Sequence, residues 1–396
     1  MIVVGLSSGT SVDGIDVAAA ELELTGDTVV FTPLGHLEVP FAPELRTAVL
    51  DALPPAPTTL DAVARIDTGL GRAFATAALR GIDDLAGGRA DLVASHGQTL
   101  FHWVEGDRVH GTLQLGQPAW IAEATGLPVV SDLRARDVAA GGHGAPLASV
   151  LDVLLLGDRA ARAGGPVAAL NLGGIANVTV VGPAGATTAF DTGPANALLD
   201  AAVRAATGEH RDTDGRRAAR GTVDEHALAR LQAEPYYGLR PPKSTGKELF
   251  DTGYVDRVLG GRAIALDDLL ATLVELTATT VADALRPHGV REVLVSGGGA
   301  RNPAMVAALE RHLAPARLVP ISETGLPGDG KEALLFALLG FLTWHGVPST
   351  VPSCTGARAP TIAGRISPGA HPLRLPGPAE PPARLRVGAG AAPPGT

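Results

Sequence analysis

The 396-residue sequence contains one cysteine, three lysines and no long apolar run. The single cysteine, Cys354, excludes an intramolecular disulfide framework and a cysteine-rich metal site. The longest nearly apolar stretch, Ala333–Trp344, is far shorter than the roughly 18–20 residues of a membrane span, so it predicts a core helix. The first residues carry neither a basic segment nor an apolar run of signal-peptide length. These absences predict a soluble, cytoplasmic protein.

Acidic residues outnumber basic ones, 41 against 32, which gives a formal net charge of −9. An acidic chain disfavours nucleic acid as a partner. The 50 glycines and 31 prolines make up 81 of the 396 residues, about 20%, which is below the roughly 25–30% that signals low complexity. Most of the chain is therefore expected to fold, and its length suits two lobes of ordinary size.

Short β-branched runs alternate with longer runs of helical period, which is typical of an α/β fold. The predicted strands are 2–4, 17–24, 29–31, 92–94, 129–131, 167–170, 178–181, 187–190 and 292–296. The predicted helices are 43–53, 60–81, 194–207, 266–286, 303–313 and 333–344.

The two halves of the chain begin alike. Ile2–Thr10 and Val167–Thr179 each combine an apolar strand, a turn of small residues and a second strand. This repeat predicts duplicated lobes with a cleft between them, although two unrelated turns in a glycine-rich chain give the same pattern. We place the lobes at 1–133 and 134–367, with a C-terminal helix returning to the first. The Pro- and Gly-rich tail, 368–396, lacks a face to bury and is expected to lie on the surface or to be disordered, and to be dispensable.

Gly9–Asp16 combines two glycines, two hydroxyls and two carboxylates in eight positions. Glycines let backbone N–H groups approach a phosphate, and hydroxyls add donors. Asp13 is able to hold Mg²⁺ through water. The alternative is a hairpin turn whose Asp and Gly only satisfy turn geometry. The segment is not a Walker motif, because no Gly-Lys-Ser/Thr occurs in the chain. Asn171–Thr179 repeats the arrangement.

Asp191 lies between the predicted strand 187–190 and the predicted helix 194–207. Thr192 is expected to cap that helix, with Pro194 near its first position. A carboxylate at the carboxyl end of a strand and beside a helix N-terminus suits a catalytic base. The alternative is that Asp191 is a second capping residue.

Gly297, Gly298 and Gly299 follow a predicted strand and precede the helix 303–313. Backbone without side chains leaves room for a flat ring or a ribose, and a strand–turn–helix setting is typical of nucleotide sites. Asn302 is able to cap the helix or to donate to a ligand. Two of the three lysines lie in a different loop, 240–248, which needs a compact ammonium or holds them by chance.

His96–Thr99 follows a predicted strand and is interpreted as a turn that lines a cleft. The spacing of His96, His102 and His110 fits no zinc pattern. The arginines of Asp132–Asp137 suit an anionic group of a substrate. An internal network of Arg–Asp ion pairs is the alternative.

Taken in order, these segments resemble the anhydro-N-acetylmuramic acid kinases, which are bacterial cell-wall recycling enzymes of the actin-like ATPase superfamily. The resemblance runs from residue 2 to about residue 367. The matching segments are Gly9–Asp16, His96–Thr99, Asp132–Asp137, Ala139–Pro146, Asn171–Asn177, Asp191–Asn196, Pro242–Glu248, Leu273–Thr277, Gly297–Asn302, Gly328–Ala333 and Pro352–Gly356. The wider superfamily usually has aspartate at the position of Asn171, which weakens a direct metal role there.

The resemblance implies an α/β fold of two ribonuclease H-like lobes around a cleft, a homodimer, and the use of ATP and Mg²⁺. It implies that water opens 1,6-anhydro-N-acetylmuramic acid while the 6-oxygen takes the γ-phosphate, which gives N-acetylmuramic acid 6-phosphate. Asp191 occupies the place of the family's base. The residues expected to bind ATP are Gly9, Thr10, Ser11, Val12, Asp13, Gly14, Ile15, Asp16, Gly173, Gly174, Gly297, Gly298, Gly299 and Asn302. Those expected to bind the sugar are His96, Gln98, Thr99, Arg134, Asp137, Asn196 and Glu332.

Two other functions are compatible with the sequence. One is a different sugar or acid kinase of the same fold, and the other is a binding or filament protein switched by ATP. Release of ADP that depends on the anhydro sugar favours the first interpretation, whereas sugar-independent ATPase activity favours the switch.

Overall fold

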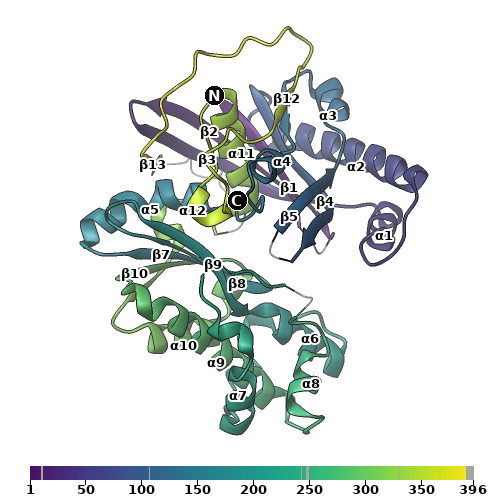
Figure 1. Cartoon of the computed structure of the whole chain (residues 1–396). Helices are drawn as coiled ribbons and strands as arrows, with labels where there is room; N and C mark the ends of the chain where they lie inside the picture. The colour runs from purple at the N-terminus through teal and green to yellow at the C-terminus, as the bar shows by residue number, and fades with distance from the viewer. Residues whose placement is uncertain (10–11, 107, 242, 247–248, 329, 389–396) are drawn as a thin grey trace. The chain divides into compact units, whose positions relative to one another are not determined.

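The computed structural model describes residues 1–9, 12–106, 108–241, 243–246, 249–328 and 330–388 (Figure 1). The chain forms two compact units: unit 1 contains Met1–Leu155 and Thr324–Thr396, and unit 2 contains Leu156–Glu323. This division differs from the boundaries after residues 133 and 367 that we expected. The segment 134–155 lies in unit 1 because its side chains bond to that unit, as described below.

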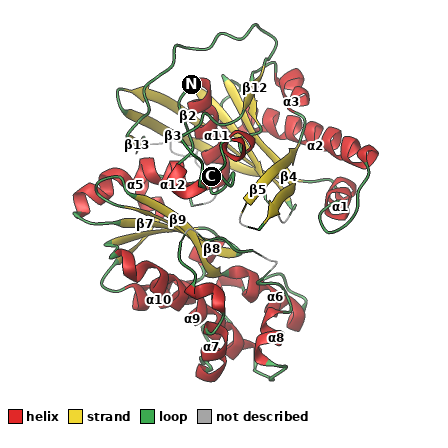
Figure 2. Ribbon diagram, in the orientation of Figure 1, coloured by secondary structure: helices red, strands yellow, loops and turns green. Residues whose placement is uncertain are grey.

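Unit 1 is built on a mixed sheet flanked by helices (Figure 2). Its strands are β1 (Ile2–Ser8), β2 (Gly14–Thr25), β3 (Thr28–Pro40), β4 (Leu92–Glu105), β5 (Arg108–Leu115), β6 (Val129–Ser131), β12 (Arg365–Ser367) and β13 (Arg384–Val387). Their order is β12-β6-β4-β1-β2-β3-β13, and β5 pairs with β4. The first three strands form an antiparallel meander, whereas β4 is parallel to β1 and β6 is parallel to β4.

Two long helices cover opposite faces of this sheet. Val4 contributes to the core under α2 (Leu60–Arg80). Gly5, the next residue, faces α11 (Lys331–Trp344), because a Cβ at Gly5 would lie 2.0 Å from the carbonyl oxygen of Ala333. Neighbouring residues of a strand point to opposite faces, so the two helices sandwich β1. α11 is buried through almost its whole length, which confirms the predicted core helix.

The other helices of unit 1 are shorter. They are α1 (Pro43–Asp51), α3 (Pro118–Thr125), α4 (Ala135–Ala139) and α12 (Pro352–Thr355), and α5 (Ser149–Ala163) continues into unit 2. Within the described residues, no helix is both long and apolar enough to span a bilayer.

Unit 2 contains a second mixed sheet. Its strands are β7 (Val167–Leu172), β8 (Ile175–Val181), β9 (Thr187–Pro194), β10 (Glu292–Ser296) and β11 (Arg317–Pro320), in the order β11-β10-β7-β8-β9. Its α-helices are α6 (Asn196–Thr207), α7 (Glu225–Gln232), α8 (Tyr254–Leu259), α9 (Leu266–Leu285) and α10 (Pro303–Leu313). Leu170 and Val178 of the sheet share one buried core with Leu273 of α9.

The same strand order in both units confirms the predicted duplication. In each unit an antiparallel meander comes first, and two parallel strands are then added beside its first strand. This is the ribonuclease H-like order, and the chain is accordingly a duplicated α/β protein of the actin-like class. The Gly-rich turn between the first two strands occupies the same topological position in each unit.

The described part of the C-terminal tail differs from our expectation. β13 pairs in parallel with β3, with Arg384 opposite Thr28, and the yellow β13 lies beside the purple β3 in Figure 1. The side chain of Leu385 is 7% exposed, and Arg384 pairs with Asp27 at 3.0 Å. The expectation that the tail buries no face is therefore wrong, because four residues of a Pro-rich segment are enough to extend a sheet edge.

Deletion of residues 380–396 is expected to lower the free energy of unfolding by about 1–3 kcal/mol. The deletion exposes the surface that Leu385 covers and leaves the backbone groups of β3 unpaired at the sheet edge. Urea unfolding of the full and shortened chains measures the difference. Leu385→Ala, which keeps the backbone ladder, should show only part of the loss. Equal stability of the two chains would contradict a structural role for β13.

Candidate functional site

The predicted phosphate turn of unit 1 joins β1 to β2. Thr10 and Ser11 lie outside the described residues. Val12 is fully buried and has a φ of 55°, in the left-handed region that β-branched residues avoid. Ser8 Oγ lies 2.9 Å from the Gly14 carbonyl oxygen, at the base of the turn. Such strain persists only where the surroundings hold the backbone in place, and it is concentrated at ligand sites.

Gln98 supports this turn through both ends of its side-chain amide. Its Oε1 accepts from Ser8 Oγ at 2.6 Å, and its Nε2 donates to the Gly9 carbonyl at 3.3 Å. Gln98 is 1% exposed. It connects β4 to the phosphate turn and positions it, and its contact with the sugar stays a prediction.

Asp13 directly precedes β2, and Asp16 is its third residue, next to the buried Ile15. The Asp13 side chain is 61% exposed and pairs with Arg46 at 3.1 Å. Asp16 is partly buried and lies opposite Ser7 in the β1–β2 register. In the part of the chain that the structure describes, no group of three or more His, Cys, Asp or Glu side chains is placed to hold a metal ion. A cation at this turn would therefore need further oxygen ligands from phosphate or water.

Four of the residues expected to bind the sugar come together in unit 1, and His96 and Arg134 are in direct contact. Arg134 Nε donates to His96 Nε2 at 2.8 Å, and Arg134 Nη1 donates to the Gly144 carbonyl at 2.7 Å. Since His96 Nε2 accepts, the ring proton lies on Nδ1, which is 2.9 Å from the Gly97 carbonyl. Burial, and then the charge of Arg134, lower the pKa of His96 to about 3. The imidazole is thus neutral and orients the guanidinium.

Asp137 and Glu332, the other two, differ in exposure. Asp137 is fully buried: its Oδ2 accepts from the Gly144 N–H and its Oδ1 accepts from Thr355 Oγ1, both at 2.8 Å. Both oxygens of Asp137 therefore have partners inside unit 1, and its contact with the sugar stays a prediction. Glu332 is exposed in the first turn of α11. Burial lowers the pKa of Arg134, and the charges of Glu332 and Asp137 oppose that shift. Glu332 is thus the acid of this cluster that a ligand is able to reach.

Acidification is expected to destabilise the fold through His96. Its pKa is about 3 in the folded chain against an ordinary 6.5, so between these values the unfolded chain binds more protons and stability falls as the pH decreases. Between pH 7 and pH 5.5, His96 alone should remove about 1 kcal/mol. Urea unfolding at both pH values, with His96→Gln as the comparison because it keeps an acceptor for Arg134, measures this contribution. The same pH dependence in both proteins would contradict it.

The second turn, with Gly173 and Gly174, joins β7 to β8 in unit 2. The Gly173 carbonyl accepts from the Asn196 N–H at 3.0 Å, and the Gly174 carbonyl accepts from the Ala195 N–H at 2.9 Å. Asn196 Nδ2 donates to the Leu172 carbonyl at 3.0 Å. Asn196 therefore fastens the beginning of α6 to the turn, and its side chain already has a partner inside unit 2.

Three consecutive glycines follow β10. Backbone conformation requires glycine at Gly297, and packing requires it at Gly299. Gly297 has a φ of 85°, and a Cβ at Gly299 would lie 2.7 Å from Leu172 Cβ. At Gly298 the nearest atom to a Cβ would be Asn196 Nδ2 at 3.7 Å, an ordinary contact. Gly298 is also exposed. It is thus the position of the three where a side chain would affect a ligand without disturbing the fold.

Asn302 caps α10. Its Oδ1 accepts from the N–H groups of Ala304 at 3.0 Å and Met305 at 3.2 Å. With 8% of its surface exposed, the residue acts as an N-cap, which is one of the two roles that its sequence position allowed.

Gly298→Val is expected to fold like the wild type and to weaken ATP binding by about tenfold or more, since a branched side chain would stand on the surface expected to receive the nucleoside. Titration with a fluorescent ATP analogue measures the affinity. Gly299→Val serves as the contrasting variant, because its side chain would collide with Leu172 and lower stability instead. Unchanged ATP affinity in Gly298→Val would show that this turn is only structural.

Asp191 is held by a loop that follows it by about fifty residues. Its Oδ2 accepts from the Thr245 N–H at 2.9 Å and from Ser244 Oγ at 3.1 Å. Its own N–H donates to the Lys243 carbonyl at 3.0 Å. Oδ2 of the carboxylate is therefore held by this loop, and so is the backbone amide of the residue. Sequence reasoning missed Ser244 and Thr245, although the concentration of lysines had singled out their loop.

Lys243 anchors this loop. Its Nζ donates to the carbonyls of Tyr236 and Tyr237, both at 3.1 Å, and lies 4.6 Å from the centre of the Tyr236 ring. The Tyr236 hydroxyl donates to the Asp191 carbonyl at 2.9 Å. Burial lowers the pKa of Lys243, and the charge of Asp191 opposes that shift. These contacts suit a compact ammonium at Lys243. Lys247 lies outside the described residues.

The helix after Asp191 begins later than expected. β9 runs to Pro194 and α6 begins at Asn196, without a side-chain cap. Thr192 Oγ1 donates to the Ala176 carbonyl at 3.2 Å, so the prediction that Thr192 caps the helix is wrong. Pairing with β8 continues to the end of β9, and these backbone hydrogen bonds outweigh the local capping pattern.

Comparison with known proteins gives one consistent family. A family model described as anhydro-N-acetylmuramic acid kinase matches residues 1–369. The anhydro-N-acetylmuramic acid kinase of Streptomyces coelicolor is 59% identical over 391 residues, which are 98% of this chain and 99% of that protein. The enzyme of the same name from Rhodococcus erythropolis is 53% identical and covers 94% of this chain and 96% of its own length. A solved structure of the ROK hexokinase from Thermus thermophilus is similar over 86% of this chain and 99% of its own, with 16% identity and a TM-score of 0.37. On the family match and these identities, the chain belongs to the anhydro-N-acetylmuramic acid kinase family.

Proposed function

We propose that this chain is an ATP-dependent kinase that opens 1,6-anhydro-N-acetylmuramic acid with water and phosphorylates its 6-oxygen, in the recycling of peptidoglycan. Membership of the family over both units supports the substrate and the reaction. The observation that carries the mechanism is the fixed carboxylate of Asp191, which accepts two hydrogen bonds on Oδ2 at the end of β9.

Water adds its oxygen to the anomeric carbon and gives a proton to Asp191, and the bond between that carbon and the 6-oxygen breaks. The 6-oxygen forms a bond to the γ-phosphorus of ATP, and the bond between this phosphorus and the β-phosphate oxygen breaks. The products are N-acetylmuramic acid 6-phosphate and ADP. Thr245 and Ser244 keep the carboxylate in one orientation, which general-base catalysis requires.

The two Gly-containing turns supply the phosphate contacts in this proposal. Gly9–Asp16 and the Gly173–Gly174 turn offer backbone N–H groups, and Gly298 offers an open surface to the nucleoside. Mg²⁺, when bound, neutralises phosphate charge, and Asp13 would hold it through water, since carboxylate and water oxygens are its preferred ligands. Arg46 is a competitor for Asp13, 3.1 Å away. The family also supports a homodimer and a cytoplasmic location. Sedimentation of the purified protein measures the oligomeric state.

Labelled water tests this chemistry. In H₂¹⁸O the proposal requires one heavy oxygen on the anomeric carbon of the product and none in its phosphate. Analysis must be immediate, because a reducing sugar exchanges its anomeric oxygen with solvent. Label in the phosphate would indicate an ATPase that hydrolyses ATP directly. Preference for free hexoses over the anhydro sugar would indicate an ordinary sugar kinase.

A further inference from the structure

Asp191 lies on β9, which within the described residues is the edge strand of the unit 2 sheet and pairs with β8 alone. The N–H and C=O groups of one residue in an antiparallel strand point to the same side. The Asp191 N–H donates to the Lys243 carbonyl at 3.0 Å, and the Asp191 carbonyl accepts from the Tyr236 hydroxyl at 2.9 Å. Two residues from other segments therefore hold the backbone of Asp191 on the open side of the edge strand.

Tyr236 and Lys243 also contact each other. Lys243 Nζ donates to the Tyr236 carbonyl at 3.1 Å and lies 4.6 Å from the centre of the Tyr236 ring. Tyr236 belongs to the short helix η3 (Pro235–Gly238), is 6% exposed, and packs edge-on against Phe250 with 6.1 Å between the ring centres. A closed circuit of contacts thus runs from the Asp191 carbonyl through the tyrosine and the lysine back to the Asp191 amide. Because the tyrosine ring is fixed in the core, the circuit fixes the backbone of Asp191 as well.

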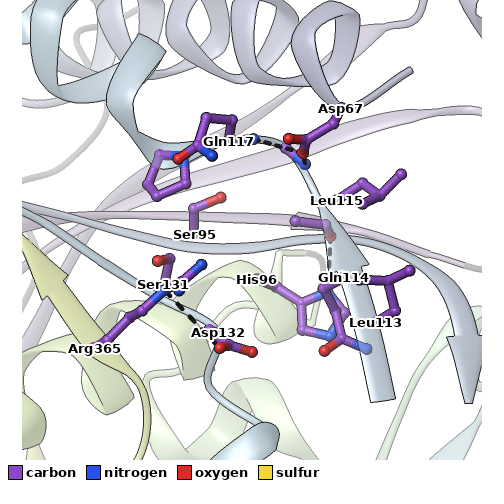
Figure 3. A pocket seen from close by; sticks show the side chains of 13 residues that line it. Asp67, Ser95, His96, Leu113, Gln114, Leu115, Gln117, Ser131, Asp132 and Arg365 are labelled. Atoms are coloured by element: carbon purple, nitrogen blue, oxygen red, sulfur yellow. Dashed lines mark hydrogen bonds and ion pairs between the residues drawn. The ribbon is translucent and has the colours of Figure 1, made fainter. Parts of the chain in front are cut away.

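Asp67, which lines a cavity of about 160 Å³ in unit 1, shows how a carboxylate is held where the backbone needs no such help (Figure 3). Its Oδ1 accepts from the N–H groups of Gly116 at 2.8 Å and Gln117 at 3.0 Å. Asp67 lies inside α2, where the helical hydrogen bonds fix the backbone on both sides of the residue. Asp191 has a neighbouring strand on one side only, so the contacts of the tyrosine and the lysine take the place of the missing neighbour.

We propose that Tyr236 is a positioning residue for the base Asp191, with Lys243 fixing the tyrosine in turn, an inference that rests on the proposed function. A general base must keep its carboxylate oxygen within hydrogen-bond reach of the proton that it takes. Misplacement of a reacting group by about 1 Å costs as much as about 10²-fold in rate. The Tyr236 hydroxyl acts through the backbone of Asp191, so its loss slows the proton transfer and leaves the binding of ATP and sugar in place.

Tyr236→Phe in the full chain removes the hydroxyl alone and tests the assignment through ADP release with the anhydro sugar. It should lower kcat by about tenfold and leave the KM values for ATP and sugar within about twofold. In the Asp191→Asn chain the same substitution should change the residual rate by less than about twofold, because a residue that acts through Asp191 then has no base left to position. Lys243→Met, which removes the ammonium beside the tyrosine ring, is the second variant and should also lower kcat by about tenfold or more with KM retained.

Tyr254→Phe is the matched control. Tyr254 also packs on Phe250, with 5.0 Å between the ring centres, and is 2% exposed, but its hydroxyl faces Glu234 Oε2 at 3.5 Å. This variant should keep the wild-type kcat, and urea unfolding shows that both tyrosine variants are folded. An unchanged kcat in Tyr236→Phe, equal losses in the two tyrosine variants, or a full further loss in the Asp191→Asn chain would overturn the assignment and leave the proposed function standing. A wild-type chain that releases no ADP with the anhydro sugar would overturn the proposed function and the inference together.

Discussion

Asp191→Asn should reduce kcat by about 10²–10⁴-fold while the chain remains folded. Asparagine keeps an oxygen able to accept from Thr245 and Ser244, so the geometry at Oδ2 is preserved. The amide cannot take the proton of the attacking water, so chemistry is lost while binding is retained. Coupled measurement of ADP release, together with ATP and sugar titrations, separates the two effects.

Asp214→Asn provides the control for this substitution. Asp214 is also in unit 2, its side chain is 59% exposed, and its φ of 56° suits asparagine. This variant should retain its activity. If Asp191→Asn kept more than about a tenth of the wild-type rate, Asp191 would not be the base, given the loss expected on removing one.

Gly5→Val should destabilise unit 1 by about 4 kcal/mol or more, which is a large part of the stability of an ordinary domain. A Cβ at Gly5 would lie 2.0 Å from the Ala333 carbonyl oxygen and 2.7 Å from the Ala337 nitrogen. Both atoms belong to the backbone of α11, so no side-chain rotation relieves the collision, and the buried helix must leave the sheet. Urea unfolding and hydrogen exchange of the β1 amides measure the loss.

Gly328→Ala is the comparison for this variant, because a Cβ there meets no atom within 4 Å. It should leave the unfolding midpoint nearly unchanged. A Gly5→Val chain with wild-type protection of β1 would show that α11 does not pack on the sheet as described.

The duplicated fold was predictable because its evidence is local. Ile2–Thr10 and Val167–Thr179 carry the same strand–turn–strand pattern, and pairing reproduces it in both sheets. β5 escaped prediction, since its hairpin with β4 exposes side chains such as Trp103 and Leu113 and lacks a clear buried face. β13 escaped for a different reason: its pairing with β3 joins residues more than 350 positions apart, and no local pattern records such a partner.

The sequence singles out the segments of the candidate site but not the role of each side chain. Asp191, Arg134 and Glu332 lie in the expected motifs, yet the spacing of residues cannot show which polar side chains form hydrogen bonds inside the protein. Gln98 and Asp137 both form such bonds. Ser244 was missed because its partner is fixed only by tertiary folding, and a Ser-Thr pair in a loop has no distinctive local signal.

Unit 1 is built from two segments that are separated in sequence by unit 2. The two segments of unit 1 are therefore synthesised at different times. Met1–Leu155 leaves the ribosome first, but α11 belongs to Thr324–Thr396 and emerges only after all of unit 2. At about 5–20 residues per second, synthesis of residues 156–396 takes roughly 10–50 s. Throughout that interval the Gly5 face of the nascent sheet has no covering helix. The first half of the protein is accordingly the part expected to expose an apolar face during synthesis, whereas the whole of unit 2 is available once residue 323 is made.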